Sequence, residues 1–329
     1  MTQVFDEEIY DIVERGLLGK GLTEAETLKL YQVQETSKEA AYIRWAGQEL
    51  SLRAADGKAE IHAQIGLNST ICPKNCKFCS FASCNSSRKG KFELAKEDVL
   101  EYAKIYMEDG ANLMLLLTTA SYSFEKLVDM VGSVREVIGD DMPLLVNTTA
   151  LKAAGANGAY HAVRMREGVD TEIPVEMRME TFANLAAAGM SLSTCVEPVG
   201  PEHTPEEITE ATFRCIGTHP VSAGVGKRVA VPGTQLYDLG MRTDVSNANM
   251  VAIYRLASGI EPRLNCSANT VMTAASGANL AWAEVGTNPR DTVERTEHGG
   301  RGASFAQQRK MFLASGWEIV DGPSKGWML

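Results

Sequence analysis

Three closely spaced cysteines are the residues of this chain best suited to chemistry. Cys72, Cys76 and Cys79 lie within Ile71–Phe81 and are separated by three and then by two residues. One short loop can therefore turn all three sulfurs toward one point. Soft thiolates at this spacing select zinc or an iron–sulfur cluster.

The number of nearby ligands distinguishes these two metal centres. A structural zinc site normally needs a fourth protein ligand, usually from a second cysteine or histidine pair, and the sequence contains no second pair. Three thiolates on a four-iron cluster would instead leave one iron free to bind a small molecule. A zinc knuckle and three free buried thiols remain as alternatives.

The cysteine trio resembles the signature of the radical S-adenosylmethionine (radical SAM) enzymes, with the aromatic Phe78 directly before Cys79. In that family the open iron binds the amino and carboxylate groups of S-adenosylmethionine, and an electron from the cluster cleaves the sulfonium to give a 5′-deoxyadenosyl radical. The resemblance implies that Cys72, Cys76 and Cys79 hold a [4Fe-4S] cluster and that Phe78 packs near the adenine. It also implies a low-potential electron donor such as ferredoxin or flavodoxin.

Beyond the cysteines, the resemblance covers roughly residues 58–320 and is strongest to the biotin synthase-like branch, which includes the iron-only hydrogenase maturase and methylornithine synthase. It implies that Arg178 binds the carboxylate of S-adenosylmethionine and that Glu167 contacts the same cosubstrate. A salt-bridged barrel rim is the alternative interpretation of Glu167 and its neighbours Arg164 and Arg166. Val231–Leu236 also resembles the turn after the sixth strand of this branch, and Arg263–Cys266 and Ser276–Leu280 resemble its seventh and eighth strands.

The chain also departs from its relatives. Leu117–Ser121 stands where many members have a Gly-Gly-Glu run that grips the methionine ammonium, so backbone carbonyls and the hydroxyl of Thr118 or Thr119 would have to substitute. Biotin synthase itself holds an auxiliary two-iron cluster with three cysteines and an arginine. The second and third predicted strands lack cysteine here and Ala268 stands near the arginine position, so sulfur insertion by that route is disfavoured.

Three further residues are candidates for a role in catalysis. Cys195 and Cys266 are expected on inward-facing barrel strands, although a free cysteine is often a small core residue. Arg228, like Glu197, is expected at a strand end. An unpaired charge inside a barrel is costly, so such side chains must face polar substrate or each other.

The pattern of apolar segments predicts the scaffold. Strands alternate with helices from residue 58 onward, which predicts a parallel sheet, and eight such units predict a closed (β/α)8 TIM-type barrel. A partial (β/α)6 barrel is the alternative. Residues 1–57 are expected to form an N-terminal helical extension and residues 58–329 the barrel domain.

The cysteine loop, which we expect to continue through 86–90, follows the first strand, where barrels place their active sites. The expected strands are 59–66, 113–118, 143–147, 160–164, 191–196, 222–230, 261–265 and 279–284.

Composition restricts the partners. The 329 residues carry a net charge of −10 without a lysine or arginine run, which argues against nucleic acid and anionic membrane. The sequence has no run of eighteen apolar residues, and its first residues are acidic, unlike a signal peptide. The odd number of cysteines, seven, and the tight trio do not suit disulfides. We therefore expect a cytoplasmic protein with a small-molecule substrate.

These features lead to one main hypothesis. The chain is a radical SAM enzyme whose deoxyadenosyl radical abstracts hydrogen from a small polar metabolite, in the biosynthesis of a cofactor or metabolite. One alternative is a maturase of the iron-guanylylpyridinol cofactor of iron-only hydrogenase, suggested by the run Glu197–Thr204. The other is a non-catalytic iron–sulfur or zinc-binding protein.

Overall fold

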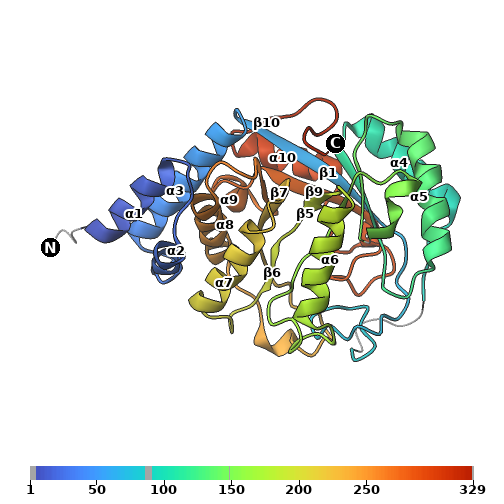
Figure 1. Ribbon diagram of the computed structural model, residues 1–329, viewed down its shortest axis with the longest axis horizontal. Helices are drawn as coiled ribbons and strands as arrows, with labels where there is room; N and C mark the ends of the chain where they lie inside the picture. The colour runs from blue at the N-terminus through green and yellow to red at the C-terminus, as the bar shows by residue number, and fades with distance from the viewer. Residues whose placement is uncertain (1–4, 86–90, 148, 328–329) are drawn as a thin grey trace.

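A closed barrel of parallel strands forms the centre of the molecule. The computed structural model describes residues 5–85, 91–147 and 149–327, and within them eight parallel strands close into a ring because β1 pairs with both β2 and β9 (Figure 1). This confirms the predicted (β/α)8 barrel and excludes the six-unit alternative. In ring order the strands are β1 (Lys58–Gly66), β2 (Leu113–Leu117), β3 (Leu144–Val146), β4 (Gly158–Tyr160), β5 (Ser191–Ser193), β7 (Ser222–Lys227), β8 (Leu264–Cys266) and β9 (Leu280–Gly286).

Amphipathic helices cover the outside of the barrel. In α5 (Phe124–Ile138), Leu127, Val131 and Val134 recur at helical spacing and pack in the core with strand residues. Thr204 caps α7 (Pro205–Ile216) in a capping box with Glu207. The other helices that follow strands are α4 (Lys96–Asp109), α6 (Val175–Ala187), α8 (Asp244–Ser258), α9 (Val271–Ala274) and α10 (Phe305–Ala314).

Two parts of the predicted strand pattern are wrong. The fourth strand ends at Tyr160, where the sequence pattern placed its start, and a short 3-10 turn, η1 (Thr149–Ala154), replaces a helix before it. The predicted strand 191–196 is divided, because the chain leaves the ladder after β5 and re-enters as β6 (Val196–Val199), which pairs with β7. Pro198 has no backbone N–H to donate, which explains why β6 stays short and irregular.

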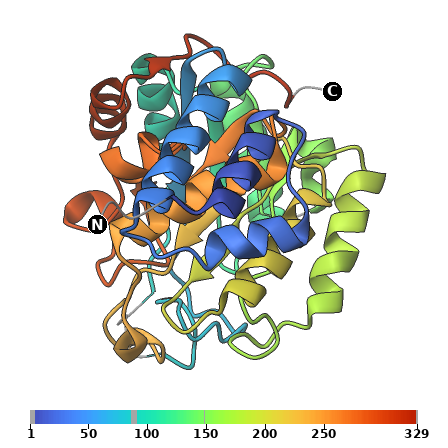
Figure 2. The same cartoon turned by 90° about the vertical axis from the view of Figure 1, so that its left-hand side faces the viewer.

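The N-terminal helices pack on one side of the barrel. These are α1 (Glu7–Leu17), α2 (Glu24–Tyr31) and α3 (Lys38–Ala54), and they gather beside α8 in Figures 1 and 2. Ile12, Leu30 and Ile43 share an apolar cluster with Leu256 of α8. At Gly47 an added Cβ would lie 2.6 Å from the Cα of Ala252, so the two helix backbones approach too closely for a side chain. We propose that residues 1–57 form an extension docked on the barrel of residues 58–329.

The last residues of the described chain close the amino-terminal end of the barrel. After α10, β10 (Glu318–Ile319) pairs with β1, and Trp327 is fully buried against apolar residues at the beginnings of the strands. The amide of Ser324 donates to the carbonyl of Asn112 at 2.7 Å. The tail thus plugs the end of the barrel opposite the cysteine loop.

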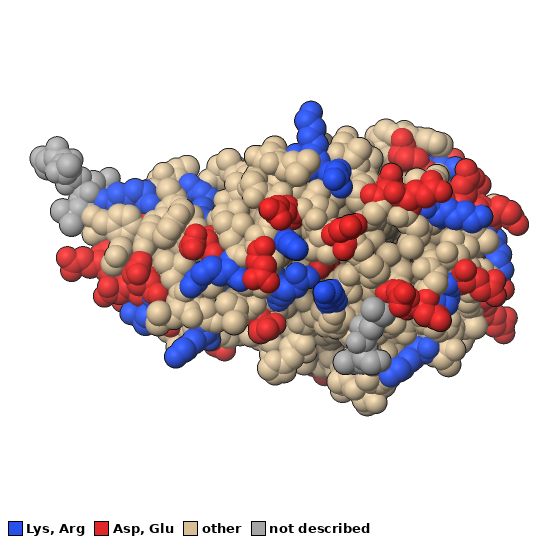
Figure 3. All heavy atoms as spheres, turned by 90° about the horizontal axis from the view of Figure 1, so that it is seen from above, with Lys and Arg blue, Asp and Glu red and all other residues tan. Residues whose placement is uncertain are grey.

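The outside of the molecule carries charges of both signs. On the face shown in Figure 3, acidic and basic side chains are interspersed. In the described part of the chain, the helices are too short or too polar to cross a membrane.

Candidate functional site

The three cysteines lie in a compact loop at the carboxyl end of β1. The amide of Cys72 donates to the carbonyl of Phe81 at 2.8 Å, and the amide of Cys79 donates to the carbonyl of Cys76 at 3.0 Å. The side-chain nitrogen of Asn85 donates to the carbonyls of Cys76 and Cys79 at 3.2 and 2.7 Å. The backbone path of this loop is therefore fixed by its own hydrogen bonds. Residues 86–90, expected to continue it, lie outside the described residues.

Asn75 makes the sharp turn between the first two cysteines possible. Its φ of 48° lies in the left-handed region, which asparagine tolerates better than most residues. Its side-chain oxygen accepts the amide of Cys84 at 3.1 Å and a hydrogen bond from the hydroxyl of Ser83. The turn is thereby tied to the returning half of the loop.

The electrostatics of the loop suit a bound cationic centre. Burial raises the pKa of Cys76 to about 11, against the opposing charge of Arg164, and burial raises the pKa of Cys79 to about 12. Such thiols become stable thiolates when a metal supplies positive charge. The sulfur of Cys79 already accepts the amide of Phe81 at 3.4 Å, a contact of the kind that tunes iron–sulfur clusters.

The spacing of the ligands favours a cluster over a single ion. Among residues 5–85, 91–147 and 149–327, no three histidine, cysteine, aspartate or glutamate side chains converge on one point as a single metal ion requires. A four-iron cluster holds its cysteines further apart, because each binds a different iron. Three cysteines in one loop, without a second cysteine or histidine pair in the sequence, suit a four-iron cluster with one open iron.

The connection from β4 to α6 packs on the cysteine loop. The amide of Lys77 donates to the carbonyl of Asp170 at 2.9 Å, and the amide of Glu172 donates to the carbonyl of Lys74 at 3.0 Å. These contacts bring the predicted cosubstrate residues Glu167 and Arg178 to the cysteines.

Glu167 and Arg178 form an ion pair. Glu167 Oε2 accepts Arg178 Nε at 3.0 Å, and the carboxylate is fully buried while 21% of the Arg178 side chain is exposed. Among the described residues, no hydrogen-bond partner contacts the two Nη atoms of Arg178. These nitrogens are available for an anionic ligand, and binding of the cosubstrate by either residue stays a prediction. Arg166 pairs instead with Glu207, on the outer side of the connection.

A second ion pair joins the segment after β4 to β6. The guanidinium of Arg164 and the hydroxyl of Tyr160 both donate to Glu197 Oε1. Burial works to raise the pKa of Glu197, but Arg164 and Tyr160 outweigh it and hold this pKa below its ordinary value. Arg164 and Glu197 retain 24% and 29% of their side-chain exposure, so both can reach a ligand.

A third ion pair completes the polar mouth of the barrel. Glu284 of β9 pairs with Arg290 and accepts the side-chain amides of Asn288 at 2.9 Å and Gln64 at 3.2 Å. Burial raises the pKa of Glu284 despite the positive charge of Arg290. The sequence interpretation did not single out Tyr160. The signal that could have found it is a polar residue at the carboxyl end of a barrel strand.

The threonines after β2 lie beside the cysteine loop. The hydroxyl of Thr119 is buried and bonds to Asn68 Nδ2 and to the Thr70 hydroxyl, each at 2.8 Å. The hydroxyl of Thr118 donates to Asn147 Oδ1 at 3.1 Å. Both hydroxyls therefore have protein partners, and their predicted role in holding the cosubstrate stays a prediction.

Two other features of the resemblance meet at the cysteine loop. Phe78 is half-buried within it. The turn Val231–Leu236 docks on it, because Leu236 donates its amide to the carbonyl of Lys77 at 3.3 Å and Gln235 donates its amide to Asn85 Oδ1 at 3.1 Å. The packing of Phe78 near the adenine stays a prediction.

Arg228 lies apart from the residues that surround the cysteine loop. Its guanidinium is 1% exposed, binds both carboxylate oxygens of Glu202 and donates to the carbonyl of Gly240 at 3.0 Å. These contacts tie the segment after β7 to the connection between β6 and α7. They support a structural role, and the predicted catalytic role has no support from its surroundings.

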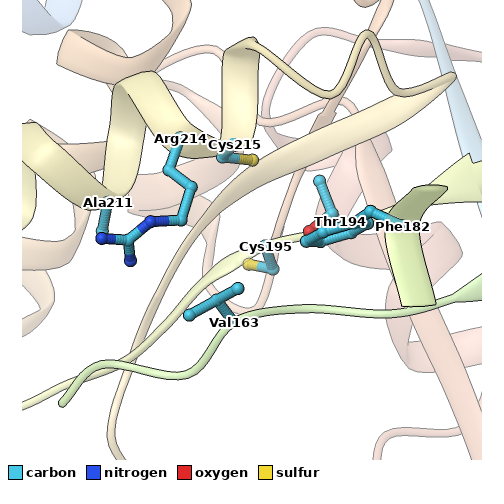
Figure 4. A pocket seen from close by; sticks show the side chains of 7 residues that line it. All are labelled: Val163, Phe182, Thr194, Cys195, Ala211, Arg214 and Cys215. Carbon is cyan, nitrogen blue, oxygen red and sulfur yellow. The ribbon is translucent and has the colours of Figure 1, made fainter. Parts of the chain in front are cut away.

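Cys195 and Cys266 are both buried. Cys195 also lines a small pocket on the outer side of the strands, of about 230 Å³ including its open mouth, between α6 and α7 (Figure 4). Ligand pockets usually have volumes of about 300–1,000 Å³, so this pocket is too small for a nucleoside cosubstrate. It is lined by Val163, Phe182, Thr194, Cys195, Ala211, Arg214 and Cys215.

Comparison with known proteins gives a consistent result. No family model matches the chain. The biotin synthase of Nocardioides sp. is 26% identical over 219 residues, which are 61% of this chain and 58% of that protein. Biotin synthase 1 of Corynebacterium diphtheriae is 23% identical over 290 residues, 82% of this chain and 77% of that protein. The match to the first of these relatives thus spans less than two thirds of its length.

Solved structures show the same fold. Methylornithine synthase (PylB) superposes with a TM-score of 0.70 at 17% identity, covering 82% of this chain and 85% of that one. The FeFe-hydrogenase maturase HydG of Carboxydothermus hydrogenoformans gives a TM-score of 0.72 at 15% identity, covering 96% and 80%. The sequence relatives and the barrel agree with the cysteine signature, and the chain is similar to the biotin synthases and shares the fold of methylornithine synthase and HydG.

Proposed function

We propose that this protein cleaves S-adenosylmethionine reductively and uses the resulting 5′-deoxyadenosyl radical to abstract hydrogen from a small polar metabolite. When bound, a [4Fe-4S] cluster supplies the electron and one open iron site for the cosubstrate. Cys72, Cys76 and Cys79 hold it. The observation that carries the proposal is the compact loop that presents three half-buried cysteines at the carboxyl end of β1.

The neighbouring residues bind and orient the cosubstrate. Arg178 binds its carboxylate through the two Nη atoms that have no hydrogen-bond partner among the described residues, while Glu167 fixes the guanidinium through Nε. Thr118 and Thr119 offer carbonyl and hydroxyl oxygens to its ammonium, and Phe78 packs near its adenine. A planar guanidinium is well suited to a carboxylate because it can donate two parallel hydrogen bonds.

The polar mouth supports the proposed class of substrate. Arg164–Glu197 and Arg290–Glu284 place two guanidiniums and two carboxylates at the carboxyl ends of the strands, and 45% of the Arg290 side chain is exposed. A charged side chain with accessible surface can exchange its ion-pair partner for a polar group of a small substrate. An apolar substrate would cover these charges without offering them a new partner. We therefore place the enzyme in the biosynthesis of a cofactor or small metabolite, with ferredoxin or flavodoxin as electron donor.

The test is anaerobic reconstitution with iron and sulfide, followed by reduction in the presence of S-adenosylmethionine. The wild-type protein should release 5′-deoxyadenosine, and Cys76→Ala should lose both the brown chromophore and this product. Cys84→Ala is the matched control, because Cys84 lies in the same loop but is exposed, and it should retain both. Cleavage that persists in Cys76→Ala would remove the trio from the reaction. A brown wild-type protein without product would be an electron carrier.

A further inference from the structure

The ion pair between Arg164 and Glu197 uses only part of each side chain. Arg164 Nη1 donates to Glu197 Oε1, and the same oxygen accepts the hydroxyl of Tyr160. Within residues 5–85, 91–147 and 149–327, Arg164 Nε and Nη2 have no hydrogen-bond partner, and neither has Glu197 Oε2. The pair therefore keeps two donors and one acceptor for a ligand.

Tyr160 fixes the orientation of the free donors. The guanidinium carbon of Arg164 lies over the Tyr160 ring, 5.6 Å from its centre, at the distance of a cation–π contact. Arg164 Nη1 also donates to the Tyr160 hydroxyl at 3.3 Å. The opposite edge of the guanidinium carries Nε and Nη2, and such an edge can donate two parallel hydrogen bonds to one carboxylate. This edge therefore matches a carboxylate of the substrate.

Gly226 of β7 leaves the second oxygen of Glu197 open. A Cβ added to Gly226 would lie 3.5 Å from Glu197 Oε2 and 3.7 Å from Glu197 Cβ, which is an ordinary van der Waals distance. Gly224 on the same strand differs, because a Cβ there would overlap the carbonyl oxygen of Cys266. Packing thus requires a glycine at 224 but not at 226. The missing side chain at 226 gives a ligand atom room beside Glu197.

The free atoms of this ion pair require opposite charges. The guanidinium edge of Arg164 attracts an anion, while Glu197 Oε2 attracts a cation or another hydrogen-bond donor. A ligand that is only anionic would bring like charge to Glu197, and a simple amine would bring like charge to Arg164, which is costly. A molecule with a carboxylate and an ammonium group on neighbouring atoms satisfies both residues.

We propose that the substrate is an α-amino acid, whose carboxylate binds the Nε–Nη2 edge of Arg164 and whose ammonium binds Glu197 Oε2. This inference rests on the proposed function, and it narrows the substrate from a small polar metabolite to one chemical class. S-Adenosylmethionine also carries an α-amino carboxylate, but its proposed partner Arg178 belongs to a separate ion pair with Glu167. The substrate and the cosubstrate can therefore bind together.

The first experiment is saturation-transfer NMR with a mixture of the standard L-α-amino acids. The protein is reconstituted, left unreduced and saturated with S-adenosylmethionine, so that the cosubstrate site is filled and no turnover occurs. An amino acid of the mixture should receive saturation. Its α-hydroxy acid analogue lacks the ammonium and its decarboxylated amine lacks the carboxylate, so both should bind more weakly. No binding amino acid, or equal binding of either analogue, would overturn the proposal.

The second experiment assigns the binding to this ion pair by calorimetric titration of the amino acid found by NMR. Glu197→Gln keeps the shape of the side chain but removes its charge, so the Kd of the amino acid should rise about tenfold to a hundredfold. The Kd of the hydroxy acid should change much less.

Gly226→Ala should also weaken the binding of the amino acid, because the added methyl group covers Glu197 Oε2. Gly132→Ala is the matched control, since a Cβ at that position of α5 meets nothing within 4 Å, and it should bind like the wild type. Wild-type affinity in both Glu197→Gln and Gly226→Ala would overturn the assignment.

Failure of the proposed function would have a different signature. That function is measured by the 5′-deoxyadenosine released after reduction in the presence of S-adenosylmethionine alone. Release of this product without any amino acid binding would overturn the inference and leave the proposed function in place. Amino acid binding at Arg164 and Glu197 without release of the product would support the site and contradict the proposed function.

Discussion

Glu167 holds Arg178 in place beside the cysteine loop. Its Oε2 accepts Arg178 Nε at 3.0 Å and the backbone amide of Arg164 at 2.9 Å. A fully buried carboxylate with fixed partners cannot rotate freely, and so the guanidinium is fixed as well. The charge of Arg178 reaches the thiol of Cys76. The ion pair therefore positions a cation next to the proposed cluster, with two nitrogens still able to donate.

Arg178→Lys should weaken the binding of S-adenosylmethionine. Lysine keeps the charge but loses the planar pair of donors. The loss of one hydrogen bond to a charged group costs about 1.5–3 kcal/mol, or about tenfold to a hundredfold in Kd. Equilibrium dialysis of S-adenosylmethionine with the reconstituted protein measures the Kd. Arg309→Lys, at an exposed position on α10, is the control, and equal affinities in both variants would remove Arg178 from the cosubstrate site.

Asn75→Ala should loosen the cysteine loop. Alanine at a φ of 48° carries a steric cost of roughly 1–2 kcal/mol, and the hydrogen bonds to Cys84 and Ser83 are lost. We expect faster loss of iron to a chelator, followed by the decay of the visible absorbance. Asn184→Ala, on the exposed side of α6, should lose iron at the wild-type rate. Identical rates in all three proteins would mean that the turn does not support the cluster.

His161 should make the protein less stable in mild acid. Burial, assisted by Arg178, lowers its pKa from 6.5 to about 4. As the pH falls below 6.5, the unfolded chain binds a proton that the folded protein does not, so stability is lost between the two pKa values and is unaffected above 6.5. The loss should be about 2 kcal/mol between about pH 7.5 and about pH 5.

The variant His161→Phe tests this assignment. It keeps a ring against Phe182, which His161 contacts at 4.9 Å between ring centroids, and it cannot titrate. Urea unfolding at the two pH values should show a smaller difference in the free energy of unfolding than in the wild type. An unchanged difference would assign the acid sensitivity to another group.

Trp327→Ala should destabilise the whole barrel. The side chain is fully buried at the amino ends of the strands, and truncation of a buried tryptophan costs about 3–5 kcal/mol. Thermal or urea unfolding measures the loss. Trp45→Ala is the control, because 52% of Trp45 is exposed on α3, and it should have a much smaller effect. Equal losses would show that the tail does not close the barrel in solution.

The closed barrel and most helices could be predicted because their apolar periodicity is long and their caps are explicit. Thr204 begins α7 as its sequence indicates. The trio of cysteines is a local pattern, and it lies in one loop as expected. The start of β4 could not be located, since the short strand and the connection after it are similarly apolar.

The contacts that form when the barrel closes could not be predicted from the sequence pattern. Arg164 and Glu197 are 33 residues apart and meet only because β4 and β6 end on the same side of the ring. Trp327 follows a glycine- and proline-containing stretch without periodicity, so its burial depends on the finished barrel. Arg228 had the position expected of a catalytic residue, but its partner Glu202 comes from a different connection. Ion pairs between residues that are distant in the sequence determine which charged side chains remain available for function. The local sequence does not reveal them.

The account depends on a four-iron cluster with three cysteine ligands and one open iron. The most direct test is electron paramagnetic resonance of the reduced, anaerobically reconstituted protein with and without S-adenosylmethionine. We predict the signal of a [4Fe-4S] cluster whose spectrum changes when the cosubstrate binds, and loss of that signal in Cys79→Ala. Bound zinc, or a cluster spectrum that S-adenosylmethionine leaves unchanged, would contradict the account.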